Sequence, residues 1–368
     1  MMNELICLDM PAGPEFVDHI NRAWDSGDAI FPLDQRFPDA LRQRVLASIA
    51  PSVVVSSTGE RTKIKGKPVE SGDAVVIATS GTTGEPRGVV LTHNAVQASA
   101  QATNNRIGIR DSDAWLACLP LSHVGGLSVV LRAIISGTAV TIAPTFSDDV
   151  YQESAEQGCT LVSLVATALQ RVDASIYRKI ILGGSSMPTD LPDNVITTYG
   201  LTETGSGVVY DRRPLDGVEV RIVDDEIQLR CAMMLRQYRD GTSALTPDGW
   251  LSTGDLGSFE QGILHVNGRK TDLIVTGGEN VWPDAIEQSL RTCALVQDVC
   301  VTGTDNSEWG QVVTAWVVSG SDRPTLEQIR DHVKETLPAF CAPRLLHFVN
   351  EIPRTSLGKP IRSLLMVD

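Results

Sequence analysis

The 368-residue sequence lacks the features that mark secreted and membrane-spanning proteins. Its seven cysteines are odd in number and show neither CxxC spacing nor a disulfide framework. The first residues, MMNELICLDM, contain no basic region followed by an apolar core, so they predict no secretory signal. The longest apolar stretch, Leu127 to Ile135, contains Arg132 and is too short to span a bilayer. We therefore expect a cytoplasmic protein with reduced thiols.

The sequence also lacks an excess of positive charge. It carries 31 Lys and Arg residues against 45 Asp and Glu residues, a formal net charge of −14. Such a field repels polyanions, so we expect no binding to nucleic acid or to an anionic membrane. The apolar fraction of 42% and charged fraction of 21% are typical of a globular protein, and the length suggests two domains. An anionic ligand must therefore meet local cations.

No internal repeat, low-complexity tract or long charge run is visible in the chain. Through its first two thirds, short β-branched runs alternate with helix-like segments, which predicts an α/β layered fold. The expected elements lie at residues 75–78, 94–103, 115–119, 127–135, 139–142, 160–165 and 179–182. Ligands of open α/β sheets bind beyond the carboxyl ends of strands, where glycine-rich loops also fall in this sequence.

The pattern changes at Gly217. Alternating runs at 218–223, 226–230, 249–259 and 262–269 predict a smaller β-rich layer. The chain then starts again with a strand, a GGEN turn, a helix at 283–291, strands at 296–302 and 311–318, a helix at 326–337 and an extended tail. We expect a large N-terminal α/β domain over residues 1–267 and a small α+β domain over residues 268–368.

One loop, ATSGTTGEPRGVV at residues 78–90, is rich in glycine and hydroxyl groups. Glycines permit positive φ, so successive backbone N–H groups can converge on an anion, and Ser80, Thr82 and Thr83 add donors. Arg87 adds a positive charge. The loop matches neither GxxxxGK[ST] nor GxGxxG. It is a candidate phosphate-binding loop, and a solvated turn is the alternative.

The same loop is similar to the phosphate loop TSG[ST]TGxP[KR]G of the adenylate-forming superfamily of acyl-CoA synthetases. Other motifs of that superfamily follow in order: LPLSHVGGL at 119–127, ILGGSSMP at 181–188, TTYGLTET at 197–204, STGD at 252–255, GRKTDLIVTGGENVWP at 268–283 and PRTSLGKPIR at 353–362. Seven ordered motifs identify the chain as a member of this superfamily, which implies its fold, with a mobile C-terminal domain.

The resemblance implies a nucleotide site. Its residues are Thr79, Ser80, Gly81, Thr82, Thr83, Gly84, Arg87, Gly183, Gly184, Ser185, Thr198, Tyr199, Gly200, Thr202, Asp255 and Arg269. Tyr199 is the expected partner of the adenine ring and Asp255 of the ribose hydroxyls. Glu203 offers a hard carboxylate oxygen to the Mg²⁺ that accompanies ATP. Taken singly, such residues are more often surface carboxylates, turn residues or core side chains.

The resemblance also implies catalytic, acyl and thiol sites. The implied catalytic residues are Lys359, His123, Glu203 and Thr202. The implied acyl-site residues are His123, Gly125, Gly126, Leu127, Gly205, Ser206 and Gly207. Coenzyme A is expected at Gly277, Gly278 and Glu279, and the hinge between the domains at Thr271, where the family usually has Asp or Lys. A histidine such as His123 is also common as a satisfied core residue.

The implied reaction has two halves, with ATP, Mg²⁺ and coenzyme A as cofactor and substrates. A carboxylate attacks the α-phosphorus of ATP to give an acyl adenylate and pyrophosphate, and a thiol then displaces AMP. Rotation of the C-terminal domain about the hinge would take Lys359 out of the active site and bring the GGEN turn toward the pantetheine channel.

Within the superfamily, the short chain and the phrases LPLSHVGGLSVVLRAI and GLTETGSGVVYD resemble the o-succinylbenzoate–CoA ligases of menaquinone biosynthesis, particularly the actinobacterial type. The second carboxylate of that acid would need a donor such as Ser122, Ser206 or the amides of Gly205 and Gly207, since these phrases offer no obvious arginine partner. The alternatives are a CoA ligase for another aryl or acyl acid, or an acyl-AMP ligase that loads a separate carrier protein. A non-catalytic ATP-binding regulator would be expected to have lost Lys359 or Glu203. A homodimer is possible.

Overall fold

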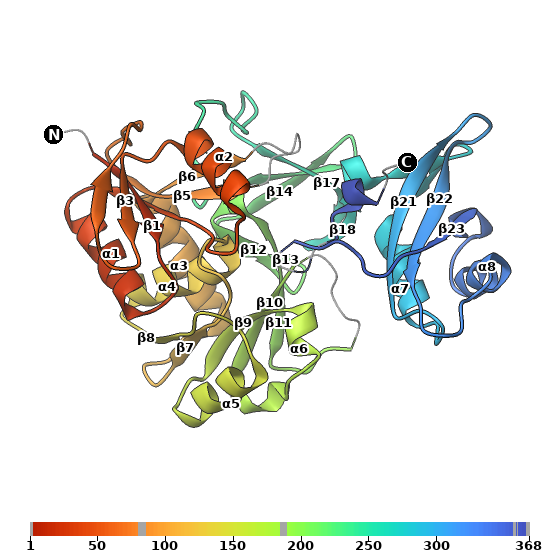
Figure 1. Ribbon diagram of the computed structural model, residues 1–368, viewed down its shortest axis with the longest axis horizontal. Coiled ribbons are helices and arrows are strands. Elements are labelled where there is room, and N and C mark those ends of the chain that lie inside the picture. Colours follow the sequence, from red (N-terminus) through yellow and green to blue (C-terminus); the bar gives the residue numbers. More distant parts are fainter. Residues whose placement is uncertain (1–2, 80–85, 185–189, 356–357, 359, 366–368) are drawn as a thin grey trace. The chain divides into compact units, whose positions relative to one another are not determined.

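The structure, a computed structural model, describes residues 3–79, 86–184, 190–355, 358 and 360–365 (Figure 1). The chain forms two compact units. The larger unit comprises Met1–Arg221, Gln228–Thr253 and Phe259–Leu264, and the smaller unit comprises Ile222–Ile227, Gly254–Ser258 and His265–Asp368. The domain boundary predicted after residue 267 falls inside a strand, β18 (Ile263–Arg269), and it stays a prediction.

The first sheet of the larger unit has seven strands in the order β16–β6–β5–β2–β1–β3–β4. Its strands are β1 (Leu5–Asp9), β2 (Ala29–Pro32), β3 (Val53–Ser56), β4 (Arg61–Lys63), β5 (Asp73–Thr79), β6 (Arg87–Thr92) and β16 (Gln237–Tyr238). Four of them, β1, β2, β3 and β5, run parallel, whereas β6 pairs antiparallel with β5 and β16 antiparallel with β6. The apolar runs in β1, β2 and β5 are buried, as expected of parallel strands covered on both faces.

The second sheet also has seven strands, in the order β13–β12–β11–β10–β9–β7–β8. Its strands are β7 (Ala114–Ala117), β8 (Ala139–Ile142), β9 (Leu161–Val165), β10 (Lys179–Gly183), β11 (Val195–Leu201), β12 (Ser206–Tyr210) and β13 (Arg213–Pro214). The run from β8 to β11 is parallel, and β12 and β13 continue it antiparallel. The strand-like segments predicted at 115–119, 139–142, 160–165 and 179–182 correspond to β7, β8, β9 and β10, whereas β11 was not predicted.

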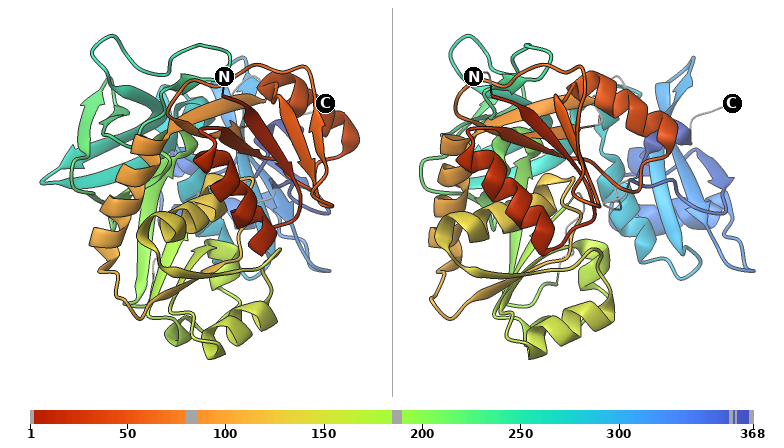
Figure 2. Two further views of the ribbon diagram at one scale, coloured as in Figure 1. Left: turned by 90° about the vertical axis from the view of Figure 1, so that its left-hand side faces the viewer. Right: turned by 60° about the vertical axis from the view of Figure 1, so that its left-hand side comes forward.

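Helices cover these sheets and fill the space between them (Figures 1 and 2). The helices of the larger unit are α1 (Pro14–Asp25), α2 (Asp39–Ile49), α3 (His93–Ile107), α4 (Val124–Ser136), α5 (Asp148–Glu156) and α6 (Ala166–Leu169), with short 3₁₀ turns η1 (Ala174–Ile176) and η2 (Thr202–Thr204). α3 packs against α4, and both contact β12 of the second sheet while α3 also contacts β5 and β6 of the first. Thr92 caps α3, since its hydroxyl accepts the N–H of Ala95.

A third sheet has four strands in the order β14–β15–β17–β18. Its strands are β14 (Glu219–Val223), β15 (Glu226–Arg230), β17 (Leu251–Glu260) and β18 (Ile263–Arg269). These four strands lie where the alternating pattern predicts them. A 3₁₀ turn, η3 (Lys270–Asp272), follows β18.

The smaller unit has a sheet of five strands in the order β20–β19–β22–β21, with β23 paired to β22. Its elements are β19 (Ile274–Thr276), β20 (Glu279–Val281), α7 (Pro283–Arg291), β21 (Asp298–Asn306), β22 (Gly310–Val318), α8 (Leu326–Lys334), η4 (Ala339–Cys341), β23 (Leu345–Phe348) and η5 (Arg362–Leu364). α7 has the predicted bounds, and α8 begins at a capping box formed by Thr325 and Gln328. Apolar residues of α7, α8 and the sheet form one core. Among the described residues, none of the helices has the length and apolarity that crossing a bilayer requires.

Candidate active site

The carboxyl ends of the parallel strands bring most of the predicted motifs of the larger unit together. β7, β9, β10 and β11 are parallel, so the loops that follow them leave from one edge of the second sheet. Those loops contain His123, Gly183, Gly184 and the turn η2 with Glu203. Similarly, β2 and β5 are parallel, so Asp34 and Thr79 lie at one edge of the first sheet. This edge position is where open α/β sheets bind ligands.

Asp34 connects these two sheet edges. Its buried carboxylate accepts hydrogen bonds from Arg36 Nε (2.8 Å) and Nη2 (2.6 Å) and from Ser122 Oγ (2.8 Å). His123 Nε2 lies 3.4 Å from the same carboxylate. Burial alone would raise the pKa of Asp34, but the hydrogen bonds from Arg36, His123 and Ser122 outweigh it and hold this pKa well below its ordinary range. Asp34 was not predicted from the sequence, and it orients the predicted catalytic histidine.

A second cluster joins the predicted phosphate cation to the predicted metal ligand. Arg87 lies over the ring of Tyr238 with its Cζ 3.7 Å from the ring centroid. The hydroxyl of Tyr238 donates to Glu203 Oε1 at 3.0 Å. Burial and the adjacent Glu203 carboxylate raise the pKa of Tyr238, so the phenol stays a neutral donor. Arg87 also contacts Thr242 and Asp240 in the loop after β16.

The turn that carries Glu203 is held by Thr204. The hydroxyl of Thr204 accepts the N–H of Leu201 (2.9 Å) and lies within hydrogen-bond distance of the carbonyls of Leu201 (2.9 Å) and Ser206 (2.8 Å). Gly200 stands at a register shift in β11, where an added Cβ would lie 2.3 Å from the carbonyl oxygen of Ser206. Only glycine fits this approach. Gly205 and Gly207 flank Ser206, so these three predicted acyl-site residues form one hairpin with the Glu203 turn.

The histidine loop is fixed equally closely. His123 is the N-cap residue of α4 and Gly125 lies in its first turn. A Cβ on Gly126 would lie 2.4 Å from the carbonyl oxygen of Leu119, so the helix start packs directly on the backbone of the LPLSH motif. Leu127 is completely buried.

The predicted adenine loop begins at the end of β10, at Gly183 and Gly184. Thr198 in the neighbouring strand donates its hydroxyl to the carbonyl of Leu182 at 3.2 Å, which holds this end of β10 beside β11. Thr202 lies in η2 and Tyr199 in β11. Seven predicted site residues lie outside the described residues: Ser80, Gly81, Thr82, Thr83, Gly84, Ser185 and Lys359.

Asp255 and Arg269 are brought together in the smaller unit. Arg269 Nε lies 3.0 Å from Asp255 Oδ1, and Asp255 is buried. Glu226 accepts the N–H of Gly254 at 3.0 Å and lies 3.7 Å from Lys270 Nζ. The carboxylate predicted to bind ribose is therefore held by the arginine predicted beside it.

The predicted hinge and thiol-site residues are exposed on the smaller unit. Thr271 lies in η3 and donates its hydroxyl to Asp272 at 3.2 Å. Gly277, Gly278 and Glu279 form the exposed turn between β19 and β20, and the N–H of Gly277 donates to the carbonyl of Trp309 at 2.9 Å. A Cβ added to Gly277 would lie 2.8 Å from the ring of Trp309, whereas Gly278 has open space around its Cα.

A metal ion at Glu203 would need ligands from elsewhere. Within the described parts of the chain, no three His, Cys, Asp or Glu residues gather closely enough to hold a metal. Mg²⁺ is commonly held by one or two carboxylates together with substrate phosphates and water. The Glu203 carboxylate, oriented by Tyr238, fits that kind of site.

Comparison with known proteins identifies the family. The family described as AMP-binding enzyme matches residues 32–231, and its C-terminal domain family matches residues 285–359. The chain therefore belongs to the AMP-binding enzyme family. It is 35% identical over 362 residues to a probable 2-succinylbenzoate–CoA ligase of Mycobacterium tuberculosis, with 88% of this chain and 93% of that protein covered. It is also 35% identical over 329 residues to a 2-succinylbenzoate–CoA ligase of Bacillus cytotoxicus, with 78% and 68% covered.

Solved structures agree with this assignment. The chain resembles o-succinylbenzoate CoA synthetase (MenE) from Bacillus subtilis in complex with the acyl-adenylate intermediate OSB-AMP, with a TM-score of 0.89 and 25% identity. The match covers 100% of this chain and 89% of that chain. The same enzyme in complex with ATP and magnesium ion matches with a TM-score of 0.88, 25% identity and coverage of 100% and 90%. The predicted superfamily and its fold, a large N-terminal and a small C-terminal part, are confirmed.

Proposed function

We propose that this protein is an AMP-forming acid–thiol ligase that converts o-succinylbenzoate, ATP and coenzyme A into o-succinylbenzoyl-CoA, AMP and pyrophosphate, a step of menaquinone biosynthesis. The observation that carries the proposal is the 35% identity to a probable 2-succinylbenzoate–CoA ligase along 93% of that protein. The geometry of the larger unit supports it, because Arg87, which we propose for phosphate, contacts the same tyrosine as Glu203, which we propose for Mg²⁺, and His123 lies beside a buried carboxylate.

The first half-reaction needs charge neutralisation more than a base. The substrate carboxylate is already ionised at about pH 7. It must approach the polyanionic phosphates of ATP, so positioning and electrostatic stabilisation carry the step. We assign Arg87 and the loop from Thr79 to Gly84 to the phosphates, with the Thr202 hydroxyl as a further donor. Glu203 would hold the Mg²⁺ that neutralises the phosphates.

The structure adds Tyr238 to this assignment. Its hydroxyl donates to Glu203 and its ring supports the guanidinium of Arg87. The same phenol therefore orients the carboxylate proposed for Mg²⁺ and the cation proposed for the phosphates. A tyrosine at this point can hold both groups at a fixed separation before ATP arrives.

We assign the nucleoside to the residues that the family resemblance implies. Asp255 would accept the ribose hydroxyls beside Arg269, and Tyr199 would stack on adenine next to Gly183, Gly184, Ser185, Thr198 and Gly200. Because Asp255 already pairs with Arg269 at 3.0 Å, ribose binding would share this carboxylate with the guanidinium.

The acyl group is assigned to the histidine loop and the hairpin after Glu203. His123, Gly125, Gly126 and Leu127 would border the aromatic part, and Gly205, Ser206 and Gly207 the far end. Ser122 is unsuited to bind the second carboxylate because its single hydroxyl proton is already donated to Asp34. Ser206 and the amides of Gly205 and Gly207 remain our proposed donors.

For the second half-reaction, we propose that coenzyme A binds at the turn of Gly277, Gly278 and Glu279. The small domain would turn about Thr271 after Lys359 has served adenylation. We also propose a cytoplasmic location and a homodimeric assembly. The alternatives are another aryl or acyl acid and a carrier-protein thiol as acceptor.

The test is pyrophosphate release from ATP with a panel of acids that includes o-succinylbenzoate and benzoate, with and without coenzyme A. We expect release with o-succinylbenzoate and formation of its thioester when coenzyme A is added. Release with a different acid in place of o-succinylbenzoate would identify that acid as the substrate. No release with any acid would favour a non-catalytic ATP-binding protein.

Lys359→Ala refines this test. It should abolish pyrophosphate release while leaving thioester formation from a supplied acyl adenylate largely intact. Equal loss of both half-reactions would contradict the division of labour between Lys359 and the Gly277–Glu279 turn.

A further inference from the structure

Two arginines flank the lysine that we propose for adenylation. Residues 353–362, the lysine loop, contain Arg354 and Arg362, and Lys359 itself lies outside the described residues. The described part of the loop folds back on itself, because Arg354 bridges to Pro360 and the N–H of Ile361 donates to the carbonyl of Pro353 at 2.8 Å. Residues 353–354 and 360–361, on either side of Lys359 in the sequence, therefore form a short antiparallel pairing.

Arg354 ties this pairing to the sheet of the smaller unit. Its Nη2 donates to both carboxylate oxygens of Asp298, the first residue of β21, at 2.7 and 2.8 Å. Its Nη1 donates to the carbonyl of Gly358 at 2.7 Å. One guanidinium thus connects the strand to the residue that directly precedes Lys359. Charge-assisted bonds of this geometry are both strong and directional.

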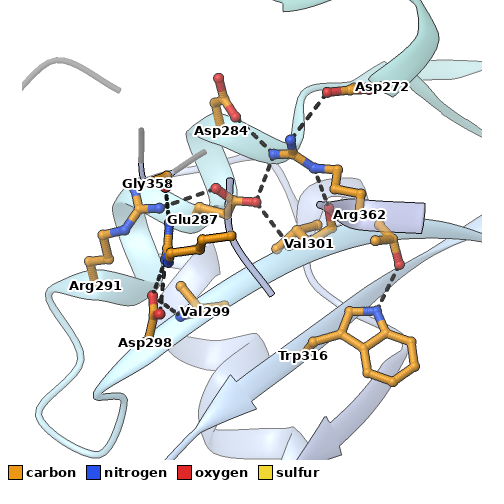
Figure 3. A network of polar contacts seen from close by, with 12 residues as sticks. Asp272, Asp284, Glu287, Arg291, Asp298, Val299, Val301, Trp316, Gly358 and Arg362 are labelled. Carbon is orange, nitrogen blue, oxygen red and sulfur yellow. Dashed lines mark hydrogen bonds and ion pairs between the residues drawn. The ribbon is translucent and has the colours of Figure 1, made fainter. Parts of the chain in front are cut away.

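Arg362 ties the other end of the loop to a buried carboxylate. Figure 3 shows its guanidinium facing Glu287 and Asp284 of α7 and Asp272 of η3. The distances are 2.8 Å to Glu287, 3.0 Å to Asp284 and 3.1 Å to Asp272, and Nε donates to the carbonyl of Val301 at 3.1 Å. Glu287 is buried and also accepts the N–H of Val301 at 2.9 Å.

These contacts also reach the proposed hinge. Asp272 directly follows Thr271, so Arg362 links the end of the lysine loop to the first residue after the hinge. β21, α7 and η3 are all held by the two arginines. Any rotation about Thr271 would therefore carry the lysine loop with the body of the smaller unit instead of letting it move independently.

We propose that Arg354 and Arg362 are positioning residues for adenylation, which fix the lysine loop to β21, α7 and η3 so that Lys359 is delivered in one geometry. The inference rests on the proposed function for the step that Lys359 serves. Misplacing a catalytic group by about 1 Å can lower a rate by about 10²-fold. Loss of the Arg354 contacts should therefore slow adenylation without removing any group that touches substrate.

Arg354 is the better residue to test because its removal should not unfold the unit. Its side chain is 28% exposed and that of Asp298 is 33% exposed. A partly exposed pair contributes about 0–1 kcal/mol to stability, so a purely structural role predicts little change in rate. Arg354→Lys keeps the positive charge but loses the fork that reaches Asp298 and Gly358 together.

The first measurement compares half-reactions in the full-length chain. Arg354→Ala should slow pyrophosphate release by about 10²-fold with little change in the KM for ATP, and Arg354→Lys should fall between this variant and the unmodified chain. Thioester formation from a supplied acyl adenylate should change by less than about threefold. Lys334→Ala, which removes an exposed ion pair with Asp331 on α8, is the matched control and should change neither half-reaction. Equal loss of both half-reactions, or no loss of either, would overturn the proposal.

The second measurement does not depend on the acid. Amide hydrogen exchange of the unliganded chain reports on the N–H groups of Gly358 and Ile361, which donate to the carbonyls of Thr355 and Pro353. Both should exchange about tenfold faster or more in Arg354→Ala than in Lys334→Ala. Unchanged exchange would overturn the proposed role of Arg354. If the unmodified chain releases no pyrophosphate with any acid, the proposed function fails, and this measurement still decides whether the arginine holds the loop.

Discussion

Two arginines that are equally prominent in the family motifs sit in opposite surroundings. Arg87, in the predicted phosphate loop, is 34% exposed and pairs with Asp240, which is 52% exposed. Arg362, the last residue of the lysine loop, is 13% exposed and pairs with Glu287, which is 1% exposed. The first cation lies where water can replace its partner. The second is held by a carboxylate that water does not reach.

This difference in exposure indicates that Arg87 is available to bind a ligand, whereas Arg362 stabilises the fold. An exposed pair contributes about 0–1 kcal/mol, so Arg87 can leave Asp240 for a phosphate at small cost. Removing one partner of a buried pair costs about 3–5 kcal/mol because it leaves an uncompensated charge. Arg362 is therefore committed to its carboxylates whether or not a nucleotide is bound. The predictions below test how far burial accounts for this difference.

The largest effect is expected for Arg362→Ala. It should lower the free energy of unfolding by up to about 3–5 kcal/mol, because the buried Glu287 would lose Arg362 and keep only the partly exposed Arg291, whose Nη2 lies 3.2 Å from Oε2. Chemical denaturation of the whole chain measures this, and exchange of the Val301 amide, which donates to Glu287, reports the local effect.

Arg171→Ala is the matched control, since Arg171 and Asp148 form a pair in which both side chains are more than half exposed. It should change the free energy of unfolding by less than about 1 kcal/mol. If both variants lost the same amount, burial would not explain the contrast between Arg87 and Arg362.

A smaller loss of stability is expected for Asp34→Asn. This variant tests whether the loss depends on burial of the carboxylate or on the unit in which the carboxylate lies. Asp34 is a buried carboxylate in the larger unit, where Arg87 also lies. Leaving its donors without a charged acceptor should cost about 1–3 kcal/mol of stability. The same variant should slow adenylation if Asp34 orients His123 as proposed. A loss below about 0.5 kcal/mol, the size expected of a surface substitution, would mean that burial of the carboxylate alone does not determine the loss of stability.

The pH dependence of this variant has a fixed sign. Because the pKa of Asp34 is held below its ordinary range, its contribution to stability is complete above its unfolded pKa, about 4, and is lost as pH falls through its folded value. The difference in unfolding free energy between the unmodified chain and Asp34→Asn should therefore be largest near neutral pH and shrink below about pH 4. Denaturation curves across this range measure it, and a difference that grew toward acid would contradict the assignment.

Asp34 also shows where sequence reasoning stops. Local patterns predicted α7 with its bounds, because the periodicity of a helix depends on neighbouring residues. Motifs predicted His123 and Glu203, and the structure places both at sheet edges. The partners that hold them are distant in sequence: Asp34 lies 88 residues before Ser122, to which it is hydrogen-bonded. No local spacing encodes such a contact, since it depends on how two sheets pack.

Other elements were missed for the same reason. β6, at Arg87–Thr92, directly follows the glycine loop and is stabilised by antiparallel pairing with β5. No alternating pattern in the sequence predicts this pairing. Tyr238 stands outside every motif, 35 residues beyond Glu203, and its position follows from the pairing of β16 with β6. Arg354 and Arg362 stood within a quoted motif, but their partners on β21, α7 and η3 were visible only after folding.

The smallest effect on stability is expected for Arg87→Ala, and it tests the other side of the contrast. Its loss should change the free energy of unfolding by about 0–1 kcal/mol, because its partners Asp240 and Thr242 lie at the surface. If Arg87 binds phosphate, the same variant should raise the KM for ATP in the pyrophosphate assay. Arg87→Lys keeps the charge but not the planar fork, so it should recover part of that loss. If Arg87→Ala destabilised the chain as much as Arg362→Ala and left the KM for ATP unchanged, Arg87 would be a structural cation stacked on Tyr238. If Arg87→Lys matched the unmodified chain, charge alone would suffice and forked recognition of the phosphates should be abandoned.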